Sequence, residues 1–261
     1  MRTATITEAA EGVHLVQGPG SNWIILTEGE DVTLIDSGYP GDLQAVRWSL
    51  RKLGHGPEDL AAILLTHAHV DHIGSVPGLI GREIGISAEG SAVPVFASAA
   101  ELPMARGEVQ EQAKPSSILV RLLRPGVLGW LASALGAGAL RHVAVPSAQA
   151  FSGPGPLDVP GHPVPIATPG HTSGHTSYHL PQSGVIVTGD ALVTAHAISL
   201  LRGPQLLPTL FSNDPAAAVA ALDALEDLDA ETILPGHGPG YHGPIREAVA
   251  RARKASKIKA G

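Results

Sequence analysis

The sequence predicts an α+β fold, with a sheet-rich core and helices packed outside it. Two observations support this prediction. Short apolar runs rich in β-branched residues, typical of strands, occur among stretches in which apolar residues recur at helical spacing. No internal repeat or inter-domain linker divides the 261 residues. We therefore expect one domain over residues 1–261, which is long enough to bury a large core.

The first part of the chain is expected to hold short strands and one clear helix. Apolar residues at helical spacing predict a helix from Asp42 to Gly54, where the glycine ends it. The stretch at 73–85 also has helical spacing, loosened by its glycines and by Pro77. The run at 61–66 is apolar, as in a strand buried on both faces. The expected strands are residues 13–17, 22–27, 31–35, 61–66 and 94–98.

Residues 99–150 differ from the rest of the chain because they are rich in Ala, Leu and Gly. We expect a helical insertion that is broken at Pro125 and Gly126. We interpret it as a lid or an elaboration within the domain. Its apolar stretch from Ile118 to Leu140 is a candidate to cover a site and select acyl chains, and a packed helical pair without that role is the alternative.

Strands return after the insertion, and two helices complete the chain. The expected strands are residues 163–168, 184–190 and 232–238, the last of which enters a turn. A helix is expected over 214–228, with Asp214 as its N-cap and Pro215 at its first position. An amphipathic helix over 243–257 closes the chain.

Composition excludes several classes of function. The chain has no cysteine, so disulfides and thiolate ligands are absent. A net charge of −7 and 3% aromatic residues argue against a nucleic-acid partner. The longest uncharged run in the middle, residues 127–140, is too short to span a bilayer. With no export signal at the start, we expect a cytoplasmic protein that binds a small molecule, and self-association stays open.

The stretch THAHVDH, residues 66–72, directly follows an apolar run and crowds four metal-capable side chains together. His67 and His69 are two apart, so near a strand end they can face the same side. Asp71 and His72 are adjacent. A turn between the two pairs would let the first pair bind one ion and the second pair bind another.

Three later stretches have the same form, in which an apolar run enters a glycine-containing turn with a histidine or aspartate. They supply His171 in TPGHTSGH, Asp190 in VTGD and His237 in PGHG. Five imidazoles and two carboxylates suit zinc, and iron or manganese as well. Seven ligands exceed what one tetrahedral ion needs, whereas two ions that share a bridging carboxylate use them all.

HAHVDH, followed by GH at 171, GD at 190 and GH at 237, resembles the metallo-β-lactamase superfamily of hydrolases from about Val13 to His237. The resemblance implies a four-layer αββα sandwich with the site at one edge between the sheets. It implies two divalent metal ions. By resemblance, the first ion is held by His67, His69 and His171, the second by Asp71, His72 and His237, and both by the bridging Asp190. Asp36 in LIDSG matches an aspartate that supports a ligand from behind.

The chemistry of two divalent ions predicts a mechanism, in which the ions lower the pKa of a shared water and the resulting hydroxide attacks an ester-like carbonyl or a phosphorus. Asp71 orients the nucleophile and passes a proton. Nucleophilic catalysis by histidine is the competing interpretation of these residues, and it leaves five of them unexplained.

Departures from known subfamilies narrow the substrate to a thioester, a lactone or another small ester. Asp190 argues against a true lactamase. The glutathione-thioester hydrolases of the glyoxalase pathway share all seven ligands, but little chain follows His237 for their substrate-binding extension. GDALVTAHA lacks the tyrosine that lactonases often carry after the bridging aspartate. A phosphodiesterase, a mononuclear iron enzyme similar to persulfide dioxygenases and a non-catalytic metal sensor remain alternatives.

Other histidines receive weaker interpretations. His175 and His179 are expected to be structural, in a turn that enters a strand. His196, Tyr241 and His242 are candidates to line the pocket.

Overall fold

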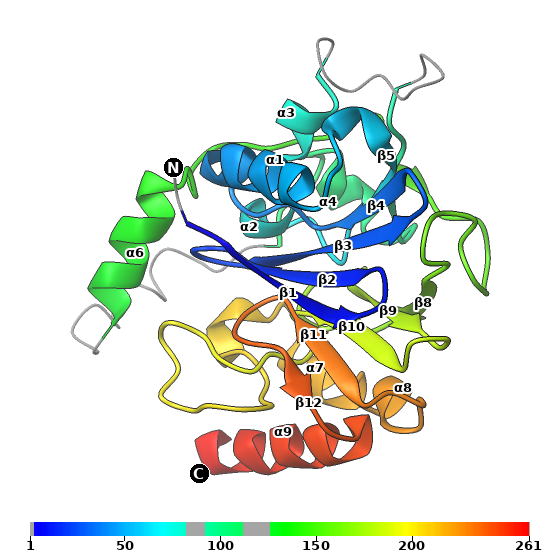
Figure 1. Ribbon diagram of the computed structural model, residues 1–261. Helices are drawn as coiled ribbons and strands as arrows, with labels where there is room; N and C mark the ends of the chain where they lie inside the picture. The colour runs from blue at the N-terminus through cyan, green and yellow to red at the C-terminus, as the bar shows by residue number, and fades with distance from the viewer. Residues whose placement is uncertain (1–2, 82–91, 112–125, 261) are drawn as a thin grey trace.

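The structure is a computed structural model that describes residues 3–81, 92–111 and 126–260. Two β-sheets face each other in the middle of the molecule, and helices cover the outer face of each (Figure 1). This is the predicted αββα sandwich. The segment 112–125, which includes the first residues of the apolar stretch proposed to cover the site, lies outside the described residues.

The first sheet has the strand order β1-β2-β3-β4-β5-β6-β7. Neighbours from β1 to β4 are antiparallel, and β4 to β7 run parallel to one another. Its strands are β1 (Thr5–Ala10), β2 (Val13–Gln17), β3 (Asn22–Glu28), β4 (Asp31–Ile35), β5 (Leu60–Leu64), β6 (Val95–Ala97) and β7 (Gln149–Ala150).

The second sheet has the order β12-β11-β10-β9-β8, in which only the pair β10 and β11 is parallel. Its strands are β8 (Val164–Ala167), β9 (Thr176–Leu180), β10 (Val185–Gly189), β11 (Thr232–Pro235) and β12 (Tyr241–His242). The parallel pairs matter for function because the carboxyl ends of parallel neighbours open onto one edge.

Helices form the two outer layers (Figure 1). Over the first sheet lie α1 (Leu43–Lys52), α2 (Val70–Ile73), α3 (Val76–Leu79) and α4 (Leu102–Ala105). Under the second sheet lie α7 (Pro215–Ala220), α8 (Asp223–Glu226) and α9 (Ile245–Ala260), while α6 (Val127–Gly136) stands at one side. Short 3₁₀ turns occur at η1 (Pro40–Asp42), η2 (Pro57–Asp59) and η3 (Thr209–Phe211).

Alternation along the strands divides the core into layers. In β3, Ile24 and Leu26 face the second sheet, whereas Trp23 and Ile25 face α1. This is the period of two that a strand buried on both faces requires. Leu64 joins the layer between the sheets with Tyr178 of β9. A third apolar layer packs β10 and β11 against α8 and α9.

One strand was not predicted, and two expected helices differ in the structure. The described part of the stretch 73–85 holds only the end of α2 and the short α3, and residues 82–85 lie outside the described residues. Strand β1 was not predicted, because it is an edge strand whose side chains are exposed or half-buried and whose sequence carries no apolar alternation. The single helix expected over 214–228 is two short helices, α7 and α8. Leu222 and Leu225 are buried in the same layer, so two short helices satisfy the apolar spacing that predicted one. No helix among the described residues is long and apolar enough to cross a membrane.

Candidate metal centre

The candidate ligands lie where strands end at one edge of the sandwich. Asp36 follows β4, His67 follows β5, Asp190 follows β10 and His237 follows β11. The pairs β4–β5 and β10–β11 are parallel, so each pair delivers its side chains to the same edge. The structure thereby brings all seven predicted ligands together, and the two sheets contribute from opposite sides.

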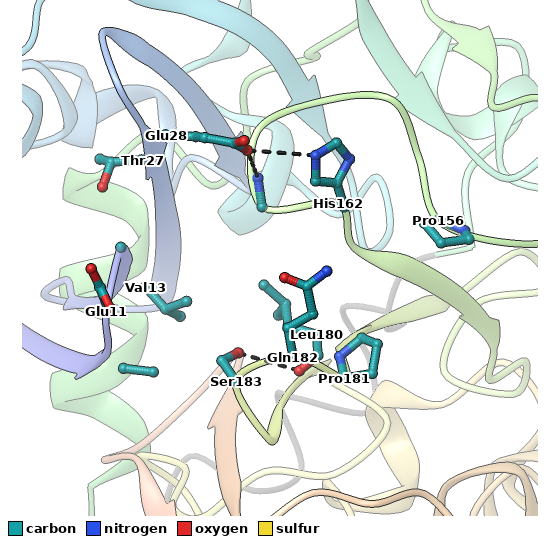
Figure 2. Close-up of a pocket in the computed structure, with 13 residues that line it drawn as sticks. Glu11, Val13, Thr27, Glu28, Pro156, His162, Leu180, Pro181, Gln182 and Ser183 are labelled. Carbon is teal, nitrogen blue, oxygen red and sulfur yellow. Dashed lines mark hydrogen bonds and ion pairs between the residues drawn. The ribbon is translucent and has the colours of Figure 1, made fainter.

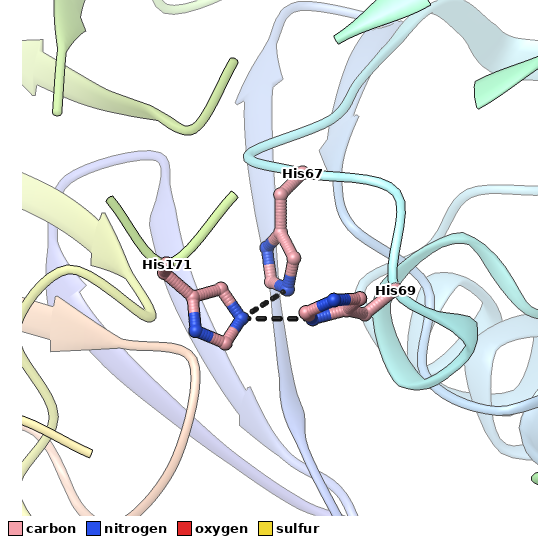
Figure 3. A group of neighbouring side chains, drawn as sticks. All are labelled: His67, His69 and His171. Atoms are coloured by element: carbon pink, nitrogen blue, oxygen red, sulfur yellow. Dashed lines mark hydrogen bonds between the residues drawn. The ribbon is translucent and has the colours of Figure 1, made fainter. Parts of the chain in front are cut away.

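His67, His69 and His171 form the first group, which we call the three-histidine group (Figure 3). His171 Nε2 lies 3.1 Å from His67 Nε2 and 2.8 Å from His69 Nδ1. The three rings thus turn one nitrogen each toward a common point, as the ligands of a tetrahedral cation do.

Hydrogen bonds behind the rings of His67 and His69 determine which of their nitrogens is free to bind a cation. His69 Nε2 lies 2.7 Å from the carbonyl oxygen of Glu111, so this nitrogen donates and Nδ1 keeps its lone pair. His67 Nδ1 lies 3.0 Å from Thr66 Oγ1, whose own proton goes to Asp36 Oδ2 at 2.7 Å. His67 Nδ1 is therefore the donor, and its Nε2 faces the centre with a lone pair.

Asp71, His72 and His237 form the second group. Asp71 Oδ2 lies 3.4 Å from His237 Nε2 and 3.9 Å from His72 Nε2. The far nitrogens of both imidazoles in this group are anchored, as are those of His67 and His69. His72 Nδ1 binds Asp36 Oδ2 at 2.8 Å, and His237 Nδ1 binds the carbonyl of Gly20 at 2.8 Å.

Asp190 lies between the two groups. Its Oδ2 is 3.4 Å from His171 Nε2 of the first group and 3.3 Å from His237 Nε2 of the second. Its Oδ1 is 3.6 Å from His72 Nε2. A carboxylate in this position can contact a cation on each side.

Two buried atoms support the fit of a cation. Among the residues that the structure describes, His72 Nε2 and Asp190 Oδ1 have no hydrogen-bond partner. A buried polar atom without a partner costs free energy, which a cation between the two atoms would offset. Asp36 also lies near His67 and His72, but its oxygens already accept hydrogen bonds from Thr66 and His72, so it supports the ligands.

The two groups differ in charge. Burial, together with the neighbouring imidazoles, lowers the pKa of His67 well below its usual value, and burial does the same for His171. Burial also opposes a charge on His72, but the carboxylates of Asp190, Asp36 and Asp71 outweigh it and raise its pKa to about 10. The three-histidine group is therefore neutral at pH 7, whereas the second group holds a proton that a cation would replace.

Two supporting residues lie behind the ligands. Nε2 of His175 accepts the backbone N–H of Asp190 at 3.0 Å, and its Nδ1 lies 2.8 Å from Thr168 Oγ1. The sequence predicted a structural role for His175 but did not identify Asp190 as its partner. Glu101, which was not singled out, is buried and bonded to the loops that carry His67, His69 and His171. Its bonds run to backbone and hydroxyl groups far along the chain, so no spacing in the sequence indicates them.

The candidates for the pocket wall separate into two sets. The His196 ring lies 5.1 Å from the His237 ring, and Trp130 and Phe211 pack against His196 at 5.9 and 5.0 Å. Tyr241 and His242 do not line the site. They pair with Ile233 and Thr232 at the start of β11, and His237 follows the other end of that strand.

A second pocket lies at the opposite end of the sandwich, between the end of β3 and the turn that joins β9 to β10 (Figure 2). Its wall carries a pair formed by Glu28 and His162 at 3.6 Å, both exposed. None of the seven candidate ligands lines this pocket.

Comparison with known proteins gives a consistent result. The family model described as the metallo-beta-lactamase superfamily matches residues 16–237, which include every candidate ligand. The probable metallo-hydrolase YflN of Bacillus subtilis is 32% identical over 253 residues, which are 91% of this chain and 88% of that protein. A hydroxyacylglutathione hydrolase of Fuscovulum blasticum is 30% identical over 191 residues, which are 73% of this chain and 53% of that protein.

Solved structures share the fold. A metallo-beta-lactamase family protein from Thermus thermophilus has a TM-score of 0.61 and 22% identity, and the match covers 96% of this chain and 81% of that one. The metallo-beta-lactamase SMB-1 has a TM-score of 0.66 and 19% identity, with 97% and 95% covered.

Proposed function

Because the chain belongs to the metallo-β-lactamase superfamily, we propose that it is a hydrolase that uses two divalent ions to cleave a small ester-like substrate, with a thioester first, then a lactone or another ester. The observation that carries the proposal is the arrangement around Asp190. Two groups of converging ligand atoms flank it, and the buried atoms Asp190 Oδ1 and His72 Nε2 lack hydrogen-bond partners among the described residues.

The ligands divide between the ions as the groups divide in space. His67, His69 and His171 would hold one ion. Asp71, His72 and His237 would hold the other, and Asp190 would contact both. Imidazole and carboxylate ligands favour zinc over magnesium or calcium, and they also suit iron and manganese.

Two bound divalent ions would lower the pKa of water to near neutral and polarise the substrate's carbonyl oxygen. The protein's part is to orient the reactants and move the proton. Asp71 suits this role because its side chain is 17% exposed, whereas that of Asp190 is 4% exposed. Its carboxylate would accept a proton from the attacking water and deliver it to the departing thiol or alcohol. Ser21 Oγ donates to the carbonyl of Asp71 and fixes its backbone.

The substrate class rests on the relatives and on the wall of the site. A relative that aligns with 73% of this chain is named a hydroxyacylglutathione hydrolase, which places thioesters first among the candidates. Trp130 and Phe211 pack around His196 beside His237. These rings would offer an apolar surface to the part of the substrate that lies next to the second group.

Elemental analysis combined with a substrate panel tests the proposal. We expect two divalent ions per chain in purified protein, and hydrolysis of a thioester, lactone or carboxylic ester that a chelator abolishes and zinc restores. Replacing Asp190 with Ala lowers metal content and turnover together, whereas replacing the exposed Asp158 with Ala changes neither. One iron per chain with oxygen consumption, turnover of phosphodiesters alone, or full turnover by Asp190→Ala would overturn the proposal.

A further inference from the structure

Glu101 is a buried acid that lies outside the ligand set. It follows the end of β6 and directly precedes α4, and its exposed fraction is 1%. Burial raises the pKa of its carboxyl to about 7. A carboxyl group in such a place needs hydrogen-bond partners to offset the loss of water.

Its partners are the two loops of the three-histidine group. Oε1 accepts the backbone N–H of Ala68, the residue between His67 and His69, at 2.7 Å. Oε2 accepts the hydroxyl of Thr172 at 2.8 Å and the N–H of Gly174 at 3.1 Å, and Thr172 follows His171 directly. One side chain thus bridges two loops that lie more than a hundred residues apart in the sequence.

The surrounding backbone strengthens this link. Ser98 Oγ donates to the carbonyl of Gly174 at 2.6 Å. A Cβ at Gly174 would collide with the backbone of Ala100 and Glu101, so glycine permits the close approach. Farther along the same segment, Glu111 accepts from His69 Nε2 with its carbonyl and from the N–H of Ser173 with its carboxylate.

We propose that Glu101 is the positioning residue of the three-histidine group: it sets the separation of the loops that carry His67, His69 and His171, and so preorganises these ligands for a divalent ion. The inference rests on the proposed metal centre. It assigns to Glu101 no contact with the substrate or the ion. Replacing a residue that supports metal ligands without touching the ion typically lowers metal affinity by roughly 10- to 100-fold.

The second group depends on different anchors, so the effect of Glu101 should be selective. Asp36 and the carbonyl of Gly20 orient His72 and His237, and Ser21 holds the backbone of Asp71. The hydrogen bonds of the Glu101 carboxylate run instead to Ala68, Thr172 and Gly174. A general loss of stability would weaken both groups, whereas a positioning role weakens one.

Glu101→Gln is the informative substitution because it preserves shape. An amide has one accepting oxygen and an NH₂ group that cannot accept from an N–H. The variant can therefore keep the bond from the N–H of Ala68 or the bond from the N–H of Gly174, but not both, whereas the hydroxyl of Thr172 can either donate to the amide or accept from it. Glu108→Gln is the matched control, because Glu108 is exposed on the same segment.

The test measures zinc affinity by competition with a chromogenic chelator in two backgrounds. In the His237→Ala background, only the three-histidine group keeps all its ligands. There Glu101→Gln should lower the affinity for zinc by roughly 10- to 100-fold. His171→Ala leaves the second group complete, and Glu101→Gln should change its affinity by less than about twofold. Glu108→Gln should change neither. Should Glu101→Gln not fold, as judged by circular dichroism, Thr172→Val removes one of the three bonds and should reproduce the selectivity with a smaller loss.

Equal weakening in both backgrounds, or none in the His237→Ala background, overturns the inference. These results are distinct from failure of the proposed function. A protein that binds two zinc ions and shows the selective effect, yet cleaves no ester, thioester or lactone, would retain the role of Glu101 and lose the hydrolase assignment.

Discussion

Asp36 shows how much of the centre depends on single side chains. Its carboxylate accepts hydrogen bonds from the N–H and the hydroxyl of Thr66 and from Nδ1 of His72, at 2.7 to 2.9 Å. It adopts a left-handed backbone conformation with φ of 62°, which is uncommon outside glycine. Through Thr66 it orients His67, and directly it orients His72, so one carboxylate serves a ligand of each group.

Replacing Asp36 with Asn should therefore weaken zinc binding at both groups, by roughly 10- to 100-fold. The amide has one accepting oxygen in place of two, so either the bond from the Thr66 N–H or the bonds from the Thr66 hydroxyl and His72 Nδ1 are lost, and the segment that carries His67 or the ring of His72 loses an anchor. Zinc retained per chain after dialysis against a chelator measures the effect. Asp31→Asn, at the exposed start of the same strand, is the control. Wild-type retention in Asp36→Asn would show that Asp36 does not support the ligands.

The raised pKa of Glu101 leads us to expect that the stability of the metal-free protein depends on pH. Burial raises its pKa from 4.5 to about 7 in the folded state. Between these two pH values the folded protein holds a proton on Glu101 that the unfolded chain has released. The stabilisation from this group is therefore complete below pH 4.5 and is lost as the pH rises to about 7. The free energy of unfolding of the wild type should fall across this window relative to that of Glu101→Gln. Parallel curves for the two proteins would refute the shift.

At the scale of elements, α6 is the helix of the predicted insertion that brings an aromatic side chain close to the site. The helix starts after Gly126, and its Trp130 packs against His196 and Phe211. The carbonyl of Ala137, at its end, accepts the N–H of Gly41 and ties the helix to the first sheet's side of the site. The helix therefore places an aromatic ring against His196, whose own ring lies 5.1 Å from that of the candidate ligand His237.

Replacing Trp130 with Ala should raise KM for thioesters with long acyl chains several-fold more than for acetyl thioesters, because apolar contact is lost only where the chain is long enough to reach the ring. A series of acyl lengths gives the comparison. Leu128→Ala, which removes a side chain that is 61% exposed on the same helix, should leave the series unchanged. An equal effect of Trp130→Ala at every length would contradict a role in selecting the acyl chain.

The sequence predicts well those features that arise locally. Strands such as 22–27 and 61–66 are apolar on both faces, and they recur in the structure as β3 and β5. The seven candidate ligands are visible because each follows an apolar run: four are crowded into residues 66–72, and the other three lie in glycine-containing turns. Glu101 and His175 act through hydrogen bonds to distant segments, and such bonds leave no periodic trace. The break between α7 and α8 was missed because the buried leucines keep one helical spacing.

At the scale of the whole molecule, the centre exists because two sheets face each other. The first sheet supplies His67, His69, Asp71 and His72 from the end of β5 onward, and the second sheet supplies His171, Asp190 and His237. Bound ions would join the two halves of the sandwich. Metal binding is therefore expected to stabilise the folded state, since an unfolded chain does not present the ligands together.

Zinc should raise the melting temperature of the wild-type protein, and a chelator should reverse the rise. At a zinc concentration of about 100 times Kd, the stabilisation for one site is about 2.7 kcal/mol. A His171→Ala, His237→Ala double variant should lose most of the shift, measured by differential scanning calorimetry. The same shift in both proteins would place the zinc at other histidines.

The claim on which the rest depends is that two ions flank Asp190. Anomalous diffraction at the zinc edge, from crystals of the zinc-loaded protein, measures this directly. We expect two peaks, one at about 2.0–2.2 Å from nitrogens of His67, His69 and His171, and one at similar distances from Asp71, His72 and His237. Asp190 should contact both. A single peak, or peaks away from these seven side chains, would contradict the account.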